Sequence, residues 1–313
     1  MILISRKSLG LLLKVLLTAA VVYFVANQVV GHWAEISGYR WQLDWIWLVL
    51  SILAALCSLL VIAFGWKGVV GSFGHDIPVR KCFRIFYLAD LGRYIPGKIW
   101  ALLGVLYLAK QEGVQPEQAT ASFVIHQFFC IPISFLIMAL AIQFESDAVA
   151  TQGGLWAGVL SAQSLWLVGV CLIPIILLIS WPRPIIAVAN FVLRLVKRPT
   201  IAFHLDKKVA LQVLVRYFLG WLGYGVAFYL FVRAVVPDAS LGLLAAAGIY
   251  NASYQIGYLT LFAPGGIGSR ELAMQAMLEP FVGPIAPAIA ILARLWVIVI
   301  EIVAALIALS IRK

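Results

Sequence analysis

Charged side chains are scarce in this chain, and those that interrupt its apolar stretches are the first candidates for chemistry. Only 12% of the 313 residues are Asp, Glu, Lys or Arg, whereas 64% are hydrophobic. Arg294 and Glu301 lie seven residues apart in the last apolar stretch, which places both on one face of a helix. Ionisable groups at the depth of a lipid bilayer are unfavourable by several kcal/mol, so they are candidates for a functional site.

Two short segments combine charges with helix-breaking residues. The first is Gly92-Arg93-Tyr94-Ile95-Pro96-Gly97-Lys98, and the second is Pro264-Gly265-Gly266-Ile267-Gly268-Ser269-Arg270-Glu271. Pro and consecutive Gly break helices, and a helix that begins after such a turn offers free backbone N–H groups to an anion. The planar guanidinium of Arg binds phosphate through two parallel hydrogen bonds.

Together these features predict a cationic cavity that receives the phosphate of an anionic head group. The candidate binding residues are Arg93, Pro96, Gly97, Lys98, His126, Pro264, Gly265, Gly266, Gly268, Arg270, Glu271, Arg294 and Glu301. The alternative is internal ion pairing, in which Arg294 contacts Glu301 or Glu271 and only holds helices together. The charges beside the two turns leave the same alternatives open. His126 taken alone is expected to be a hydrogen-bonded core residue rather than a ligand.

The composition is that of an all-α polytopic membrane protein. Soluble domains carry about 25% charged residues, twice the proportion here. Apolar stretches of the length that spans a bilayer recur along the chain. Six are predicted to be full spans, at about 9–30, 45–66, 119–143, 155–181, 209–235 and 285–309. The first is too long for a signal peptide and is expected to remain as a span.

The net charge of +10 is explained by the loops and predicts no nucleic-acid partner. Lys and Arg gather in the loops 67–84 and 183–208, whereas the loops after the first and third spans are neutral to acidic. The positive-inside rule therefore places the basic loops and both termini in the cytoplasm.

Trp45, Trp47 and Trp66 bracket the second span as an aromatic belt does. Residues 185–197 form an amphipathic stretch expected at the inner interface.

Two apolar regions that contain the Pro-Gly turns fit neither a span nor a loop. Residues 85–108 have room only for two half-helices of about 18 Å each, and residues 241–280 contain a similar break. Both are predicted to be re-entrant helical hairpins with the turn at the tip. Residues 241–262 are alternatively a full span, although the charge bias of the loops disfavours this.

An internal repeat relates the two halves of the single transmembrane domain 1–313. A shift of 168 residues carries Pro96 onto Pro264, Pro116 onto Pro284 and His126 onto Arg294. The first repeat would comprise residues 1–150 and the second residues 151–313. Each contains three crossings and one hairpin, so the second copy must start on the opposite side of the membrane. Inverted repeats of this kind are typical of transporters whose broken helices meet near the midplane.

No motif of a soluble enzyme is convincing. The segment Gly266-x-Gly268 lacks the strand and the third glycine of a dinucleotide loop. The four cysteines are scattered singly and suggest neither a metal site nor a disulfide framework. We therefore expect no cofactor and no independent catalysis.

At its two turn motifs the sequence resembles the flippase-like transmembrane domain of lysylphosphatidylglycerol synthases and its stand-alone relatives. The resemblance covers the whole chain as a pattern of spans, but it is specific only at residues 92–98 and 264–271. It implies a polytopic inner-membrane protein that moves a phospholipid or a lipid-linked sugar between leaflets, with the two motifs lining the cavity. The aminoacyl-transferase domain of the bifunctional synthases has no counterpart in these residues, so we expect no synthesis of lysylphosphatidylglycerol by this chain.

Three functions remain in competition. The inverted repeat and the buried cations favour a lipid flippase for an anionic phospholipid or a polyprenyl-phosphate-linked glycolipid. The alternatives are a membrane enzyme or accessory subunit that acts on a lipid-linked phosphate, and a non-transporting assembly partner of envelope-biosynthesis enzymes. The expected partners are the anionic lipid or lipid-linked sugar, surrounding membrane lipids and, for assembly, a second copy or such enzymes.

Overall fold

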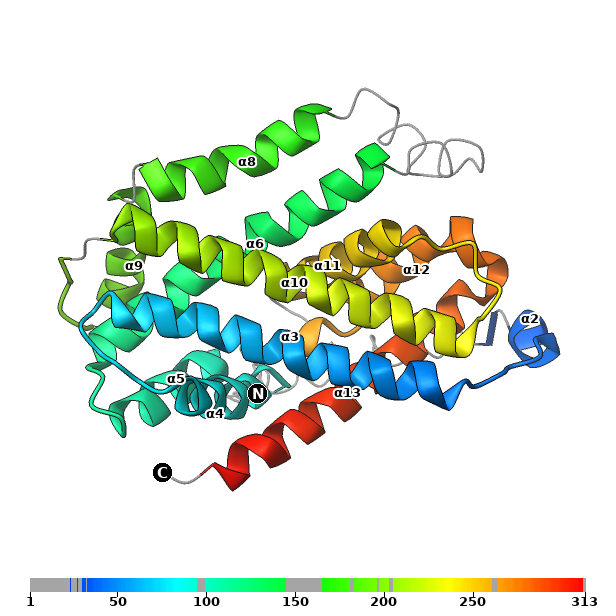
Figure 1. Ribbon diagram of the computed structural model, residues 1–313, viewed down its shortest axis with the longest axis horizontal. Coiled ribbons are helices and arrows are strands. Elements are labelled where there is room, and N and C mark those ends of the chain that lie inside the picture. The colour runs from blue at the N-terminus through cyan, green and yellow to red at the C-terminus, as the bar shows by residue number, and fades with distance from the viewer. Residues whose placement is uncertain are drawn as a thin grey trace, which may run out of the picture.

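The computed structural model describes residues 23, 27, 30–31, 33–94, 99–144, 165–180, 183–195, 197–202, 205–260 and 264–311. Every regular element in these ranges is a helix (Figure 1). The elements, of which those marked η are short 3₁₀ helices, are α2 (Trp33–Gly38), α3 (Trp45–Gly71), α4 (Val79–Asp90), η1 (Leu91–Tyr94), α5 (Ile99–Lys110), α6 (Pro116–Phe144), α8 (Leu165–Ser180), α9 (Arg183–Leu195), α10 (Lys207–Val235), α11 (Leu243–Leu259), η2 (Pro264–Gly266), α12 (Ser269–Val282), η3 (Gly283–Ile285) and α13 (Ala286–Ser310).

Within the described ranges, four helical runs are long and apolar enough to cross a membrane, so the chain is a multi-pass membrane protein. They are α3, α6, α10 and the run Ser269–Ser310, which ends in α13, and each contains one of the predicted spans. The predicted span 155–181 overlaps α8, but its first ten residues lie outside the described residues. Most of the predicted span 9–30 also lies outside them.

The antiparallel pair of α3 and α10 lies side by side along the long axis of the molecule (Figure 1). Asp44 begins α3, because its side chain accepts hydrogen bonds from the backbone N–H groups of Ile46 and Trp47. The N–H of Asp44 donates to the carbonyl of Ala234 at 2.9 Å, which ties the start of α3 to the end of α10. The assignment of Trp66 to an aromatic belt is wrong, because α3 continues to Gly71 and buries Trp66 completely.

Two pairs of packed helices surround the predicted turns. Helices α4 and α5 flank η1, and α11 and α12 flank η2. The first pair begins at Val79 and ends at Lys110, so the predicted bounds 85–108 are too narrow at both ends. At 12 residues each, α4 and α5 are about 18 Å long, and the 17 residues of α11 about 26 Å. The lengths of α4 and α5 fall short of the roughly 30 Å hydrocarbon core, and α11 lies at the lower end of the about 17–25 residues of a spanning helix.

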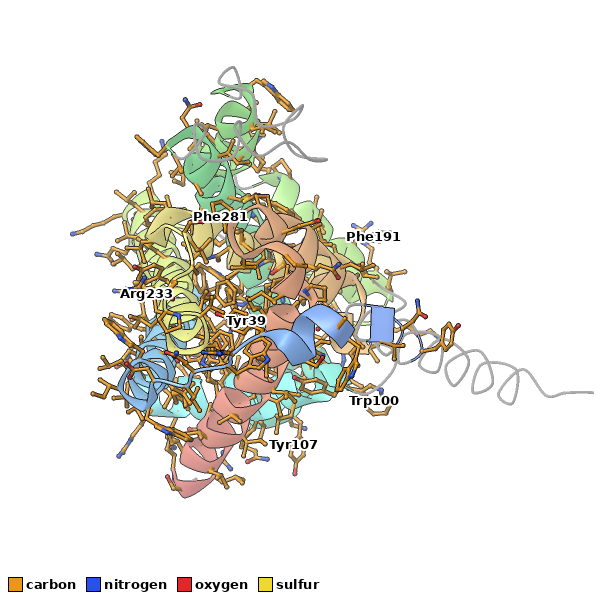
Figure 2. All side chains as sticks on the ribbon, turned by 90° about the vertical axis from the view of Figure 1, so that its right-hand side faces the viewer. Tyr39, Trp100, Tyr107, Phe191, Arg233 and Phe281 are labelled. Atoms are coloured by element: carbon orange, nitrogen blue, oxygen red, sulfur yellow. The ribbon has the colours of Figure 1, made fainter. Side chains whose placement is uncertain are left out.

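The outer surface of the bundle is apolar. Large apolar side chains project outward around it (Figure 2), among them Tyr107 and Phe191, which are 68% and 59% exposed. Phe191 lies on α9, the stretch predicted to be amphipathic, whose other face buries Ile185, Ala189 and Leu193. An apolar exterior is expected of a protein surrounded by lipid rather than water.

Small residues let the central helices approach closely, as is common where lipid removes the hydrophobic force between helices. A Cβ atom added at Gly225 of α10 would lie 2.4 Å from the Cβ atom of Ala247 on α11. One added at Gly220 would lie 2.6 Å from the side chain of Ile62 on α3. These contacts bring α11 and its turn against the α3–α10 pair.

We expect Gly225→Ala to lower the stability of the folded protein by about 1–3 kcal/mol, because overpacking forces neighbouring backbone apart. The matched control is Gly169→Ala on α8, where an added Cβ meets nothing within 4 Å. Thermal unfolding in detergent should give a lower midpoint for Gly225→Ala and no loss for Gly169→Ala. Equal midpoints would contradict the close contact of α10 and α11.

Candidate functional site

The two turns meet inside the bundle, and Arg294 of α13 bridges them. The Nη1 atom of Arg294 donates a hydrogen bond of 3.0 Å to the carbonyl of Gly265 in η2. Its guanidinium carbon lies 5.6 Å from the centre of the Tyr94 ring in η1. The two short helices also contact each other directly. Arg294 is the ninth of the 25 residues of α13, so it lies well inside this helix rather than at an end.

The glycines of the second turn make room for this contact. Gly265 and Gly266 have φ values of 57° and 70°, in the left-handed region that glycine adopts without strain. A Cβ atom on Gly265 would lie 2.9 Å from Nη2 of Arg294 and 3.1 Å from the Tyr94 ring. The Pro-Gly-Gly sequence therefore produces both the sharp turn and the space in which Arg294 and Tyr94 meet.

Glu271 connects Arg294 to the start of α12. One carboxylate oxygen accepts a hydrogen bond of 2.6 Å from the backbone N–H of Gly268, as an acidic residue in the first turn of a helix often does. The other lies 3.5 Å from Nη1 of Arg294. The structure thus pairs Arg294 with Glu271, one of the two partners considered from the sequence, rather than with Glu301.

Glu301 instead pairs with Arg93 of the first turn. Arg93 donates to Glu301 through Nη2, and its Nη1 atom lies 3.0 Å from a carboxylate oxygen of Asp90. The same Nη1 atom donates to the hydroxyl of Tyr254 at 2.7 Å. The hydroxyl of Tyr94 donates to the second oxygen of Glu301. Tyr94 therefore contacts both Arg294 and Glu301, so these two residues of α13 face the same turn.

Arg270 is held differently from Arg93 and Arg294. Its side chain is buried, with the residue 5% exposed, and its guanidinium lies 5.1 Å and 5.0 Å from the ring centres of Tyr250 and Tyr254. Among the residues that the structure describes, no carboxylate lies within 4.0 Å of Arg270. Within the described part of the chain, its Nη2 atom is buried without a hydrogen-bond partner, and so is Nη2 of Arg294.

A cavity of about 40 Å³ lies among these groups. Its lining combines the three arginines with tyrosines and glycines of the two turns and of α11, namely Arg93, Tyr94, Tyr254, Gly257, Tyr258, Gly265, Gly266, Arg270 and Arg294. That volume holds about three water-sized groups, at roughly 10–15 Å³ for each. The two arginines that carry unpartnered nitrogens thus line one cavity, which is large enough for a few oxygen atoms.

A second cavity of about 70 Å³ adjoins the first through Arg93, Tyr254 and Tyr258, which line both. Its lining includes His126 and Glu301. The ring of His126 is buried, forms a 2.8 Å hydrogen bond with the hydroxyl of Tyr217, and packs against Phe86. His126 is therefore a hydrogen-bonded core residue that borders this cavity.

Of the predicted binding residues, the structure gathers Arg93, Gly265, Gly266, Arg270 and Arg294 around the first cavity. Glu271 and Gly268 support it from α12, while Glu301 holds Arg93. Pro264 begins η2. Pro96, Gly97 and Lys98 lie outside the described residues.

Four site residues were missed from the sequence, namely Asp90, Tyr250, Tyr254 and Tyr258, and Tyr94 of the first motif was given no role of its own. Three of them carry a readable signal, because the tyrosines at 250, 254 and 258 recur every fourth residue and share one face of α11. Tyrosine combines an apolar ring with a hydroxyl that seeks a partner when buried. Such a face is suited to a helix that borders a polar cavity inside a membrane.

The fold and this cluster define the class of protein: an all-helical, multi-pass membrane protein with arginines and carboxylates buried between two broken helix pairs. The family model described as the lysylphosphatidylglycerol synthase TM region matches residues 11–307, and the chain belongs to this family. The family relates it to phospholipid modification or flipping. No curated protein matches the chain. The resemblance inferred from the two turn motifs is confirmed.

We expect Arg93→Gln to destabilise the protein more than Glu301→Gln. The first change leaves two carboxylates without their cation, a loss of about 3–5 kcal/mol for a broken buried pair. The second leaves Arg93 paired with Asp90. Unfolding in mixed micelles should show the double variant to be more stable than the sum of the two losses predicts, with a coupling of about 0.5–3 kcal/mol. Strict additivity would contradict a direct Arg93–Glu301 pair.

Proposed function

We propose that the protein is a lipid flippase that moves an anionic phospholipid or a polyprenyl-phosphate-linked glycolipid between leaflets. The observation that carries the proposal is the buried guanidinium of Arg270, which has no carboxylate within 4.0 Å among the described residues and an unpartnered Nη2 atom. Arg294 supplies a second unpartnered nitrogen to the same cavity. Both atoms are donors that a phosphate can satisfy.

The carboxylates are shared unequally among the three arginines. Arg93 has two carboxylate partners and Arg294 has one, whereas Arg270 lies over two tyrosine rings and has no carboxylate within 4.0 Å among the described residues. Cation–π contacts contribute about 0.5–2 kcal/mol, less than the several kcal/mol by which a buried charge is unfavourable. A phosphate in the cavity would give Arg270 the direct negative partner that no described carboxylate gives it and would also supply acceptor oxygens, and Arg binds it in a planar fork.

The arrangement of the helices supports transport rather than static binding. The order α3, α4–η1–α5, α6 in the first half recurs as α10, α11–η2–α12, α13 in the second. The equivalent helices α3 and α10 lie antiparallel (Figure 1), as an inverted repeat requires. In the proposal, the two helix pairs are re-entrant hairpins that enter from opposite faces and meet at Arg294, so rocking one repeat against the other opens the site to each leaflet in turn.

The membrane placement follows from the same proposal. We place the chain in the inner membrane, with both termini and the basic loops cytoplasmic, as the distribution of Lys and Arg indicates. With residues 9–30 and 155–181 as further crossings, the chain would have six spans. Short helix pairs of about 18–26 Å are tolerated inside the bilayer where they are buried in protein.

The test is a flipping assay with labelled phosphatidic acid or labelled polyprenyl phosphate in proteoliposomes. Leaflet exchange should be faster with the protein than without it. Arg270→Gln and Arg294→Gln should each slow the exchange at least about tenfold, because a hydrogen bond to a charged group contributes about 1.5–3 kcal/mol. The control is Arg216→Gln, which removes an arginine that lies over Phe64 and does not line either polar cavity.

Two results would contradict the proposal. One is exchange of both lipids at the rate of protein-free vesicles. The other is an equal effect of Arg216→Gln, Arg270→Gln and Arg294→Gln, which would show that the loss follows from a charge removed anywhere in the bundle.

A further inference from the structure

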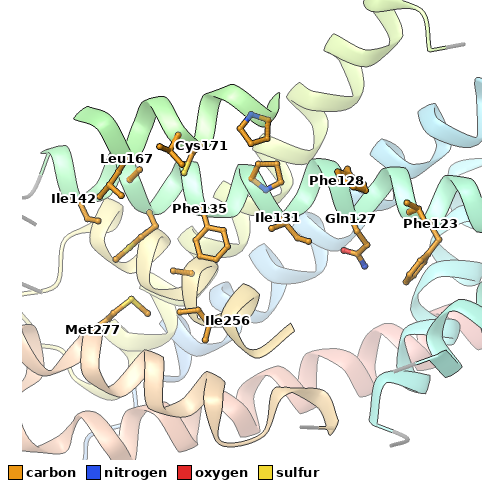
Figure 3. A pocket seen from close by; sticks show the side chains of 17 residues that line it. Phe123, Gln127, Phe128, Ile131, Phe135, Ile142, Leu167, Cys171, Ile256 and Met277 are labelled. Carbon is orange, nitrogen blue, oxygen red and sulfur yellow. The ribbon is translucent and has the colours of Figure 1, made fainter. Parts of the chain in front are cut away.

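A large apolar pocket lies beside the site, between α6 and α8 on one side and α11 and α12 on the other (Figure 3). Its volume of about 640 Å³ falls within the roughly 300–1,000 Å³ of ordinary ligand pockets. Among its described lining residues Gln127 is the one amide, and the rest are apolar side chains or Cys171. A cavity of this kind offers water few hydrogen-bond partners, so hydrocarbon is its suitable occupant.

The pocket leads to the arginines. Phe123 and Gln127, which lie together at one end of the pocket in Figure 3, also line the cavity of about 70 Å³. That cavity in turn shares Arg93, Tyr254 and Tyr258 with the cavity that holds Arg270. The three adjoining cavities thus form one path, along which the lining changes from apolar to mixed and then to cationic.

We propose that the apolar pocket binds the hydrocarbon chain of the same lipid molecule whose phosphate binds at Arg270 and Arg294. This inference rests on the proposed function and adds the ligand class: an amphiphile whose phosphate adjoins a long hydrocarbon chain. The apolar end of the path matches the hydrocarbon chain of such a molecule, and the cationic end matches its phosphate. The charged head and the chain therefore bind to the protein together.

The length of the pocket supports this ligand class. Its lining follows α6 from Phe123 to Ile142, a distance of about 28 Å at 1.5 Å per residue. This is close to the full hydrocarbon thickness of about 30 Å, and so about twice the depth of one leaflet. An extended chain fits this shape, and a compact apolar ligand would fill only part of it.

Cys171 provides a native reporter inside the pocket. It lines the pocket from α8 and is partly exposed, whereas Cys57 is exposed on α3 and does not line the pocket, and Cys82 and Cys130 are buried. Modification of Cys171 by a thiol reagent, relative to Cys57 in the same sample, is measured by peptide mass spectrometry. The lipids are phosphatidic acid and polyprenyl phosphate, and the controls are diacylglycerol and polyprenol, which lack the phosphate.

At a lipid concentration about ten times Kd, either phosphate lipid should slow the modification of Cys171 about tenfold and leave Cys57 unchanged, because only the empty protein reacts. If only one of the two lipids protects, that lipid shows whether the bound chain is acyl or polyprenyl. Protection should disappear in Arg270→Gln, which shows that head and chain belong to one molecule. Equal protection by diacylglycerol or polyprenol would overturn the inference, since any membrane lipid would then fill the pocket.

A filled-pocket variant gives an independent test. Val170 and Ile173 lie on α8 with similar exposure, 55% and 56%, but only Val170 lines the pocket. Val170→Trp should raise the lipid concentration needed for half-maximal protection and slow flipping, and Ile173→Trp should do neither. Equal behaviour of the two variants would overturn the inference.

Retention of the lipid on the purified protein, measured by mass, separates this inference from the proposed function. If the phosphate lipids are retained through Arg270 but Cys171 reacts at its unprotected rate, the chain binds elsewhere and the flippase proposal stands. If no phosphate lipid is retained, both fail.

Discussion

The structure depends on how three guanidinium groups, one of them buried and two partly buried, are held where two broken helix pairs meet. In an apolar bundle each such charge must be paired, stacked or hydrogen-bonded. Arg93 and Arg294 take carboxylates from different elements, so their pairs fasten α13 to both turns. Arg270 lies between tyrosine rings without a carboxylate within 4.0 Å in the described part of the chain. In our proposal, this charge without a carboxylate partner separates a binding site from a set of structural ion pairs.

Much of the local sequence follows from this constraint. The Pro-Gly-Gly turn leaves the space that Arg294 and Tyr94 occupy, and Glu271 serves both as the first-turn cap of α12 and as the partner of Arg294. Tyrosines along α11 present rings to one guanidinium and a hydroxyl to another. Because each group serves two neighbours, small changes in the turns should alter charge and packing together.

The sequence predicted the elements better than the contacts. Apolar length and Pro-Gly breaks were sufficient to locate four spans and both helix pairs, because these signals are local. The sequence left the partner of Arg294 open between Glu271 and Glu301, since seven-residue spacing places Arg294 and Glu301 on one face but does not say which turn each one meets. Trp66 was misjudged because its burial depends on the helices that pack against α3, among them α4, whose Phe86 ring centre lies 5.7 Å from that of Trp66.

The most direct test of the central claim is solid-state NMR of the protein in lipid, with isotopically labelled arginine and bound phosphatidic acid or polyprenyl phosphate. The account predicts dipolar coupling between the lipid phosphorus and arginine side-chain nitrogens, reduced in Arg270→Gln and in Arg294→Gln. Bound lipid whose phosphorus shows no coupling to arginine, or coupling that survives when both residues are replaced, would contradict it.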